Sequence, residues 1–461
     1  MNNTNLKDDE NILDLLSFYK NKTVLVTGHT GFKGTWLTRI LLTAGARVIG
    51  YALKPPTVPN LYSLAGFSEY KKNGNFVNVE GDVRDLKHLQ SVLTTYQPSI
   101  VFHLAAQPIV RDSYKNPVYT YETNVMGTVN VLESIRLTSS VRSAVIITTD
   151  KVYKNNEWIW GYREDEPLDG FDPYSNSKSC AELSVHSYRN SFFNSMDGIV
   201  DPTTGEKRRY VAVSTARAGN VIGGGDFAND RIIPDCIRSL EEAIKDKKDI
   251  AVIGVRNPYS TRPYQHVLEP LAMYLTIAAR QWNDRVVSSY YNVGPDDEDC
   301  VTTGDLVSLF CSKWNELVSG STSSTASRDK DRSSGQVTAN HTVVLDKGSR
   351  KDNSDNIALV QTNEVATGAS GLTSATSSNI LELEKLPHAR WESHAEKGAP
   401  HEANFLKLDS TKIKVTLGYH PRWHIVECMN KTVEFSAVYL LNPDSIPFEM
   451  DKEIKEFFSC K

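Results

Sequence analysis

The sequence predicts an α/β fold with a doubly wound, parallel, Rossmann-type sheet. Three observations support this prediction. Short apolar runs rich in β-branched residues recur along the first half of the chain, amphipathic segments of helical length separate them, and the first run ends in glycines. Strands that are apolar throughout are typical of a parallel sheet covered by helices on both faces.

The elements follow one another in strand–helix order. The run TVLV at 23–26 is the first strand, and the next strand reads VIGY after a helical segment. The run SIVFHL and the later run AVIIT are apolar enough to be fully buried strands. The predicted elements are therefore strands at 23–26, 47–51, 99–104 and 144–148, and helices at 35–44 and 124–137.

Charge and cysteine content exclude several classes of protein. The 51 Lys and Arg against 56 Asp and Glu give a net charge of -5, which offers no general attraction to nucleic acid or anionic membranes. The six cysteines form no CxxC pair and predict reduced thiols without a metal site. The first residues are polar, and no long apolar run follows. We expect a cytoplasmic protein without a nucleic-acid, membrane or metal partner.

A glycine motif follows the first strand directly and opens the first helix. Gly28, Gly31 and Gly34 stand in the spacing GxxGxxG. Glycines at such a turn let the backbone approach a pyrophosphate, which then sits at the helix N-terminus. The motif predicts a dinucleotide cofactor. The second strand ends without an acidic residue for the adenosine ribose, and Lys54 is compatible with a ribose phosphate. We expect NAD and leave NADP open.

A second motif, DPYSNSK, places a tyrosine and a lysine one helical turn apart. Asp172 is a good N-cap and Pro173 a good first helical residue, so Tyr174 and Lys178 share one helix face. A nearby ammonium favours a phenolate, so we expect Lys178 to lower the pKa of Tyr174. A YxxxK pair alone also occurs on surface helices. Its position behind the glycine motif and after a strand ending at Thr149 favours a catalytic pair.

Longer stretches resemble the CDP-glucose 4,6-dehydratase branch of the extended short-chain dehydrogenase/reductase superfamily. They include VTGHTGFKGTWL (26–37), HLAAQPIVRDSYKNP (103–117), TTDKVY (148–153), YREDEPLDGFDPYSNSKSCAEL (162–183) and ARAGNVIGGGDFANDRIIPDC (216–236). The resemblance implies an internal redox cycle. A hydride leaves carbon 4 of the sugar for bound NAD, water is lost across carbons 5 and 6, and the hydride returns to carbon 6.

The resemblance also implies roles for residues in these stretches. Tyr174 removes the proton of the 4-hydroxyl, and Thr149 hydrogen-bonds a sugar hydroxyl. Asp150 is the candidate acid toward the 6-hydroxyl. Most related dehydratases carry a Glu after this Asp, whereas this chain has Lys151, as the CDP-glucose branch does. Lys151 is a candidate base at carbon 5 only if its surroundings depress its pKa, so the identity of that base stays open.

Further residues are implied by their place in the matching loops. Arginine side chains suit a pyrophosphate, because they can form two parallel hydrogen bonds with it. For each loop residue the alternative is a plain packing role. For Asp82 and Val83 the alternative is a surface turn. Asn124 is expected to order the region of Lys178. The cofactor-binding residues are Gly28, Thr30, Gly31, Phe32, Gly34, Asp82, Val83, Leu104, Ala105, Ala106, Asn124, Tyr174 and Lys178. The substrate-binding residues are Gln107, Arg111, Asn220, Arg231, Arg262 and His401.

The chain divides into five parts. Residues 319–379 contain no aromatic residue and are dense in Ser, Thr, Asn and Gly, which predicts a disordered insertion. The remaining parts are an N-terminal extension (1–20), the dinucleotide-binding domain (21–216, with a returning segment near 250–274) and a smaller C-terminal substrate-binding cap built from 217–318 and 380–461. The resemblance further implies CDP-glucose as substrate and a homodimer.

Two other functions remain open at this point. Another nucleotide-sugar enzyme of the same fold, such as a 4-epimerase or a dehydratase for GDP- or dTDP-sugars, would share the glycine and YxxxK motifs. A catalytically silent nucleotide-sugar-binding protein would share the fold. An epimerase has no need of Asp150, and a binding protein has no need of Thr149, Tyr174 and Lys178 together. The sequence therefore favours the dehydratase.

Overall fold

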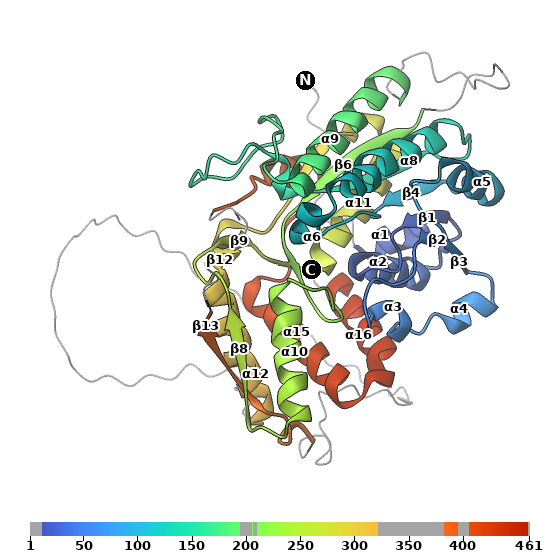
Figure 1. The fold of residues 1–461 in the computed structure, drawn as a ribbon. Coiled ribbons are helices and arrows are strands. Elements are labelled where there is room, and N and C mark those ends of the chain that lie inside the picture. Colours follow the sequence, from blue (N-terminus) through green and yellow to red (C-terminus); the bar gives the residue numbers. More distant parts are fainter. Residues whose placement is uncertain (1–11, 194–204, 206–209, 321–381, 395–404, 460–461) are drawn as a thin grey trace, which may run out of the picture.

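A parallel sheet of seven strands forms the core of the computed structural model, which describes residues 12–193, 205, 210–320, 382–394 and 405–459. Its strand order is β11-β6-β5-β4-β1-β2-β3, and all neighbouring strands are parallel (Figure 1). The winding reverses between β1 and β4, and such a reversal opens a ligand-binding crevice at the carboxyl ends of the strands. The predicted doubly wound α/β class is confirmed.

The main-sheet strands are apolar because helices cover both faces of the sheet. Every residue of β5 and β6 is buried. The strands of this sheet are β1 (Thr23–Thr27), β2 (Arg47–Ala52), β3 (Phe76–Glu80), β4 (Ile100–His103), β5 (Ser143–Thr149), β6 (Ala212–Ala218) and β11 (Tyr290–Val293).

The helices belong to two layers on the sheet and to a C-terminal cap. They are α1 (Ile12–Tyr19), α2 (Phe32–Thr43), α3 (Leu61–Leu64), α4 (Ser68–Lys72), α5 (Leu86–Tyr96), α6 (Val110–Lys115), α7 (Pro117–Tyr121), α8 (Gly127–Arg136), α9 (Pro173–Tyr188), α10 (Ile232–Lys245), α11 (Leu268–Asn283), α12 (Thr303–Val318), α14 (Thr411–Leu417), α15 (Ile425–Leu441) and α16 (Ile446–Ser459). Short 3-10 or π turns are η1 (Glu122–Met126), η2 (Asp150–Val152), η3 (Arg189–Phe193), η4 (Arg285–Val287), η5 (Asp297–Asp299) and η6 (Pro443–Ser445).

Alternate residues of each strand point into opposite helical layers. Val24 and Val26 of β1 face a large apolar cluster with α2, α11 and the C-terminal helices. Leu25 between them faces a second cluster, which α5, α8 and α9 complete. The two layers hold the carboxyl ends of the strands at one fixed edge, where loops rather than helices meet.

Three short strand pairs lie outside the main sheet and build the cap. They are β7 (Val221–Ile222) with β10 (Gln265–His266), β9 (Thr261–Pro263) with β12 (Cys300–Thr302), and β8 (Ile250–Val255) with β13 (His388–Ser393). The β8–β13 pair packs with α10 and α12 at one side of the molecule (Figure 1). Strands far apart in the sequence therefore form the cap.

The expected returning segment near 250–274 falls in both parts of the structure. Its first strand, β8, pairs with β13 in the cap, whereas α11, which begins at Leu268, packs on β5 and β6 of the main sheet and leads to β11. Buried and more exposed residues alternate along the start of β8, which is typical of a strand that faces solvent on one side and not of a central parallel strand.

The expected N-terminal extension contains a packed helix. The hydroxyl of Tyr19, at the end of α1, donates a hydrogen bond of 2.6 Å to the Leu275 carbonyl in α11, and the Tyr19 side chain is fully buried. The insertion expected at 319–379 lies, from residue 321 on, outside the described residues. In the described parts, no helix combines the length and apolar character that crossing a bilayer requires.

Candidate active site

The glycine loop lies at the carboxyl end of β1 and leads into α2. Gly28 has φ +73°, and a Cβ there would lie 2.7 Å from the Ala105 nitrogen, so only glycine fits. A Cβ at Gly34 would lie 2.1 Å from the Gly28 oxygen, whereas at Gly31 it would meet only that oxygen at 3.5 Å. The first turn of α2 has no side-chain cap, which leaves its N–H groups for an anion. The loop fits the pyrophosphate of a dinucleotide.

The other predicted cofactor-binding residues follow β1, β3 and β4 at the same edge of the sheet. Thr30 Oγ1 donates to the Leu53 carbonyl at 2.9 Å, and Ala105 N donates to Thr27 Oγ1 at 3.2 Å, which fixes the loops after β1 and β4. The Asp82 carboxylate after β3 accepts from Arg84 Nη2 at 2.8 Å. These positions lie after the carboxyl ends of neighbouring strands, where parallel sheets bind dinucleotides.

Tyr174 and Lys178 lie on the first turns of α9, with their side chains buried. Asp172 caps this helix by accepting the Ser175 N–H at 3.0 Å, and Pro173 occupies its first position. Lys178 Nζ donates to the Ile147 carbonyl of β5 at 3.3 Å. Burial lowers the pKa of Lys178 to about 8. The helix thus presents both side chains to the end of β5.

The pKa of Tyr174 differs from the sequence-based expectation. Burial raises it to about 12, the hydrogen bond with Thr149 lowers it, and the negative charge of Asp150 raises it. Lys178 directs its ammonium to a backbone carbonyl of β5, and its own pKa is depressed. The expected lowering of the Tyr174 pKa by Lys178 is not found in this structure: desolvation of the phenol is the largest influence, and the groups that lower the pKa are Thr149 and Arg231.

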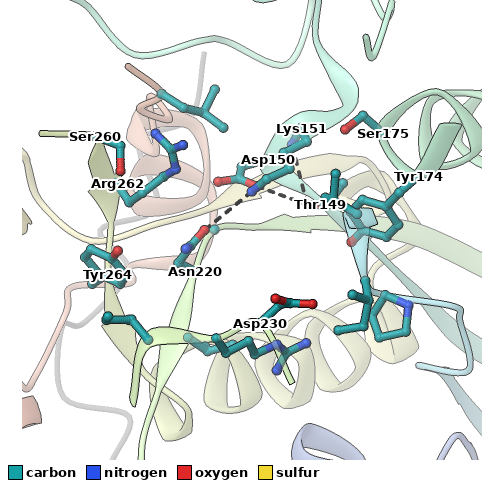
Figure 2. Close-up of a pocket in the computed structure, with 18 of the residues that line it drawn as sticks. Thr149, Asp150, Lys151, Tyr174, Ser175, Asn220, Asp230, Ser260, Arg262 and Tyr264 are labelled. Atoms are coloured by element: carbon teal, nitrogen blue, oxygen red, sulfur yellow. Dashed lines mark hydrogen bonds and ion pairs between the residues drawn. The ribbon is translucent and has the colours of Figure 1, made fainter. Parts of the chain in front are cut away.

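Thr149, Asp150 and Lys151 stand where β5 ends. Thr149 Oγ1 donates to Asp150 Oδ1 at 3.0 Å, and Lys151 Nζ approaches the same oxygen at 3.3 Å and Asn220 Oδ1 at 3.5 Å (Figure 2). The Asp150 residue is 1% exposed, and its Oδ2 atom has no hydrogen-bond partner among the described residues. A buried carboxylate oxygen without a partner is costly unless a ligand uses it. Asp150 can therefore meet a hydroxyl of a bound molecule.

A buried polar network between α9 and β6, which sequence reasoning missed, lies next to this site. Glu182 accepts from Thr215 Oγ1 and from Arg217 Nη2, both at 2.9 Å. Arg217 Nη1 also donates to the Tyr153 hydroxyl at 2.8 Å. Glu182 lies one turn after Lys178 on α9, and its charge opposes the depression of the Lys178 pKa. The spacing of four residues between Lys178 and Glu182 was the sequence signal that could have predicted this contact.

A cavity of about 990 Å³ opens beside this group of residues. Of the predicted substrate-binding residues, Arg111, Asn220, Arg231 and Arg262 line it together with Asp150 and Tyr174. Figure 2 shows Tyr174 and Thr149 on one side of the cavity and Arg262 with Tyr264 on the other. Arg231 is held by Asp226, with 2.8 Å between Nη1 and Oδ2. The volume and the facing cations suit a nucleotide sugar.

Lys33 and Arg256 are two basic cavity residues among those that sequence reasoning missed. Lys33 stands inside the glycine motif itself, and Arg256 follows β8. Lys33 was missed because the sequence motif was defined by its glycines. Arg256 was missed because the β8 segment was expected to belong to the dinucleotide-binding domain. Arg256 pairs with Asp230 of the same cavity wall, with 2.7 Å between Nη1 and Oδ1, and burial lowers the pKa of Lys33 to about 7.

Gln107 and Asn124 have structural contacts instead of a place on the cavity wall. Gln107 Nε2 donates to Thr120 Oγ1 at 3.0 Å, and its N–H donates to Asn124 Oδ1 at 2.8 Å. Asn124 Nδ2 donates to Ser177 Oγ at 2.9 Å, beside Lys178. Asn124 lies in the π turn η1, so the first residues of the helix predicted at 124–137 belong to η1 and the rest to α8. The predicted residue His401 lies outside the described residues.

Residues 25–214 match the family model described as GDP-mannose 4,6 dehydratase. The chain is 37% identical over 445 residues to the CDP-glucose 4,6-dehydratase of Salmonella typhimurium, which covers 96% of this chain and 98% of that protein. It is also 32% identical over 186 residues to the CDP-paratose 2-epimerase of Salmonella typhi, covering 37% and 53% of the two chains.

Two solved structures have a similar fold. MoeE5 in complex with UDP-glucuronic acid and NAD superposes with a TM-score of 0.56 at 20% identity, over 90% of this chain and 98% of that chain. The dTDP-glucose 4,6-dehydratase of Bacillus anthracis in complex with NAD gives a TM-score of 0.57 at 16% identity, over 91% and 97% of the two chains.

Proposed function

Because this chain belongs to the CDP-glucose 4,6-dehydratase family of extended short-chain dehydrogenases/reductases, we propose that it removes water from CDP-glucose and forms CDP-4-keto-6-deoxyglucose. One structural observation carries the proposal beyond the similarity. Tyr174, Thr149 and Asp150 line the same cavity, and Asp150 Oδ2 has no hydrogen-bond partner in the part of the chain that the structure describes. Oxidation at carbon 4 and loss of the 6-hydroxyl require a base and an acid that reach one sugar ring.

NAD is the cofactor, and the chain's own residues fit it. The backbone of the Gly28–Gly34 loop would hold the pyrophosphate, and Tyr174 with Lys178 would hold the nicotinamide half. The bound cofactor would supply reversible hydride acceptance, from carbon 4 and back to carbon 6, without net consumption. Thr149 orients the 4-hydroxyl, and Tyr174 removes its proton. Burial keeps water away from these groups, which favours the return of the hydride to the sugar.

Asp150 and Lys151 form a matched pair for the elimination of water. The 4-ketone makes the carbon 5 proton acidic. Lys151 passes one proton to Asp150 across their 3.3 Å contact, which leaves a neutral amine and a carboxylic acid. The acid protonates the departing 6-hydroxyl, and the amine takes the carbon 5 proton. The pair ends with a carboxylate and an ammonium, as it began, and no proton from solvent is needed.

The substrate is tested with purified protein and CDP-, dTDP-, UDP- and GDP-hexoses. We expect CDP-glucose to lose one water, detected by mass spectrometry, without lasting accumulation of reduced cofactor. Water loss from dTDP-glucose but not from CDP-glucose would overturn the choice of substrate. Inversion at carbon 4 without a change of mass would make the protein a 4-epimerase. Binding without any reaction would make it a nucleotide-sugar-binding protein.

We also propose that the protein is a homodimer that pairs through α7, η1 and α9. These elements pack on one another, and they expose Val118 (70%), Met126 (51%) and Leu183 (55%). Apolar side chains grouped on neighbouring helices are typical of a protein interface. A cytoplasmic location accompanies the proposal, because the five described cysteines are free thiols, as a reducing compartment keeps them.

The dimer predicts a specific effect of charge on α9. Leu183→Asp places a carboxylate in the centre of the proposed interface, and we expect it to yield monomers at micromolar concentration, measured by sedimentation velocity. Val415→Asp is the matched control, because Val415 is 80% exposed on α14, and this variant should remain dimeric. A wild-type protein that sediments as a monomer while active would contradict the proposal.

A further inference from the structure

Asp230 pairs with two arginines that come from different parts of the fold. Its Oδ1 atom lies 2.7 Å from Arg256 Nη1, just after β8 in the cap, and 3.9 Å from Arg111 Nε on α6 in the dinucleotide-binding part. All three residues line the cavity. One carboxylate therefore joins the cap to the dinucleotide-binding part across the cavity wall, and the proposed mechanism gives it no part.

The surroundings of the Asp230 carboxylate suit an anion. Two guanidinium groups face it, and arginine is well matched to carboxylates and phosphates alike. The 14-residue helix α10 begins two residues later, its first residues line the same cavity, and no side chain of the described residues caps its N-terminus, so its positive end adds to the arginines. The Asp230 side chain is 29% exposed. The protein's own carboxylate thus occupies an anion site that opens to the cavity.

The place of Asp230 along the cavity corresponds to the middle of a nucleotide sugar. In the view of Figure 2, Asp230 lies between Tyr174, at the end where the sugar is oxidised, and Tyr264 at the opposite end. A nucleotide sugar joins its sugar to its nucleoside through a diphosphate. With the sugar ring at Tyr174, the diphosphate reaches the region of Asp230 and its two arginines. The negative charges of the diphosphate then meet a carboxylate, which repels them.

We propose that Asp230 competes with the substrate: its carboxylate pairs with Arg111 and Arg256 before the substrate binds, and gives these arginines up to the diphosphate. The inference rests on the proposed nucleotide-sugar substrate but not on the identity of its base. A ligand without phosphate cannot displace the carboxylate and gains nothing from the arginines. Asp230 therefore weakens the binding of every nucleoside diphosphate, substrate and product alike, and favours release of the product.

Asp230→Asn removes the competing charge and keeps the backbone, because asparagine, like aspartate, tolerates the positive φ of 58° found at this position. The NAD-loaded holoenzyme is titrated with CDP and with cytidine in a calorimeter. CDP should bind the variant about tenfold more tightly than the wild type, because one nearby like charge is gone. This gain should shrink at high salt, which screens the repulsion in the wild type. Cytidine carries no phosphate, so its affinity should stay the same.

Asp246→Asn is the matched control, because Asp246 is a half-exposed carboxylate at the end of α10 that pairs with Lys248 and does not line the cavity. It should leave the affinity for CDP unchanged. Unchanged or weaker CDP binding in Asp230→Asn would overturn the inference, since Asp230 would then at most hold the arginines in place. An equal gain for cytidine would also overturn it, because the effect would not involve phosphate. A wild-type holoenzyme that binds no nucleoside diphosphate would refute the proposed function, and the inference with it.

Discussion

Replacing Tyr174 by Phe should slow the oxidation of CDP-glucose at carbon 4 by about a hundred- to ten-thousand-fold, the usual contribution of a general base. The variant keeps the buried aromatic ring in the first turn of α9 and loses only the hydroxyl that hydrogen-bonds with Thr149. Every later step depends on the ketone, so water loss should fall equally. Rapid mixing with substrate, followed by NADH absorbance, measures the first step directly.

A second hydroxyl deletion serves as the control for this variant. Tyr290→Phe removes a hydroxyl that forms a hydrogen bond of 2.8 Å with His186 Nδ1. Tyr290 does not line the cavity, so this variant should leave oxidation within a few-fold of wild type. Formation of bound NADH at the wild-type rate in Tyr174→Phe would show that another group takes the proton of the 4-hydroxyl.

The sequence predicted the parts of the site that lie close together along the chain. The glycine motif stands at one strand–helix junction, and Tyr174 and Lys178 are joined by helical spacing alone. Asp150 follows Thr149 directly, so the end of β5 places both side chains at one edge of the sheet. In each case local backbone geometry decides the arrangement, and local geometry can be read from a sequence.

Features that depend on tertiary packing were not predicted. The pairing of β8 with β13 joins segments far apart in the chain, and the apolar letters of β8 resemble a central strand. The direction of the Tyr174 pKa shift was also missed, because burial of the phenol, which depends on the whole fold, is its largest cause. Gln107 was expected to bind substrate, but Thr120 and Ile109 are the hydrogen-bond partners of its side-chain amide.

Replacing Asp150 by Asn should separate oxidation from elimination. Asn keeps the shape of the side chain and can accept the hydrogen bond from Thr149, but it cannot protonate the departing 6-hydroxyl. Oxidation at carbon 4 should therefore proceed, whereas water loss should fall by about a hundred- to ten-thousand-fold. Quenched samples should contain bound NADH and a 4-keto sugar that keeps its oxygen at carbon 6. This product distinguishes the variant from Tyr174→Phe, which should form no NADH.

Lys151→Ala should stop at the same point if the two side chains exchange a proton as proposed, because the amine that takes the carbon 5 proton is gone. Lys87→Ala is the control, since Lys87 is an exposed lysine on α5 that does not line the cavity and should not affect elimination. Water loss at the wild-type rate in Lys151→Ala would reduce Lys151 to a charge that neutralises Asp150, and the base would have to be another residue. Water loss at the wild-type rate in Asp150→Asn would show that Asp150 is not the acid. The proposed role would then no longer explain why its buried Oδ2 has no partner among the described residues.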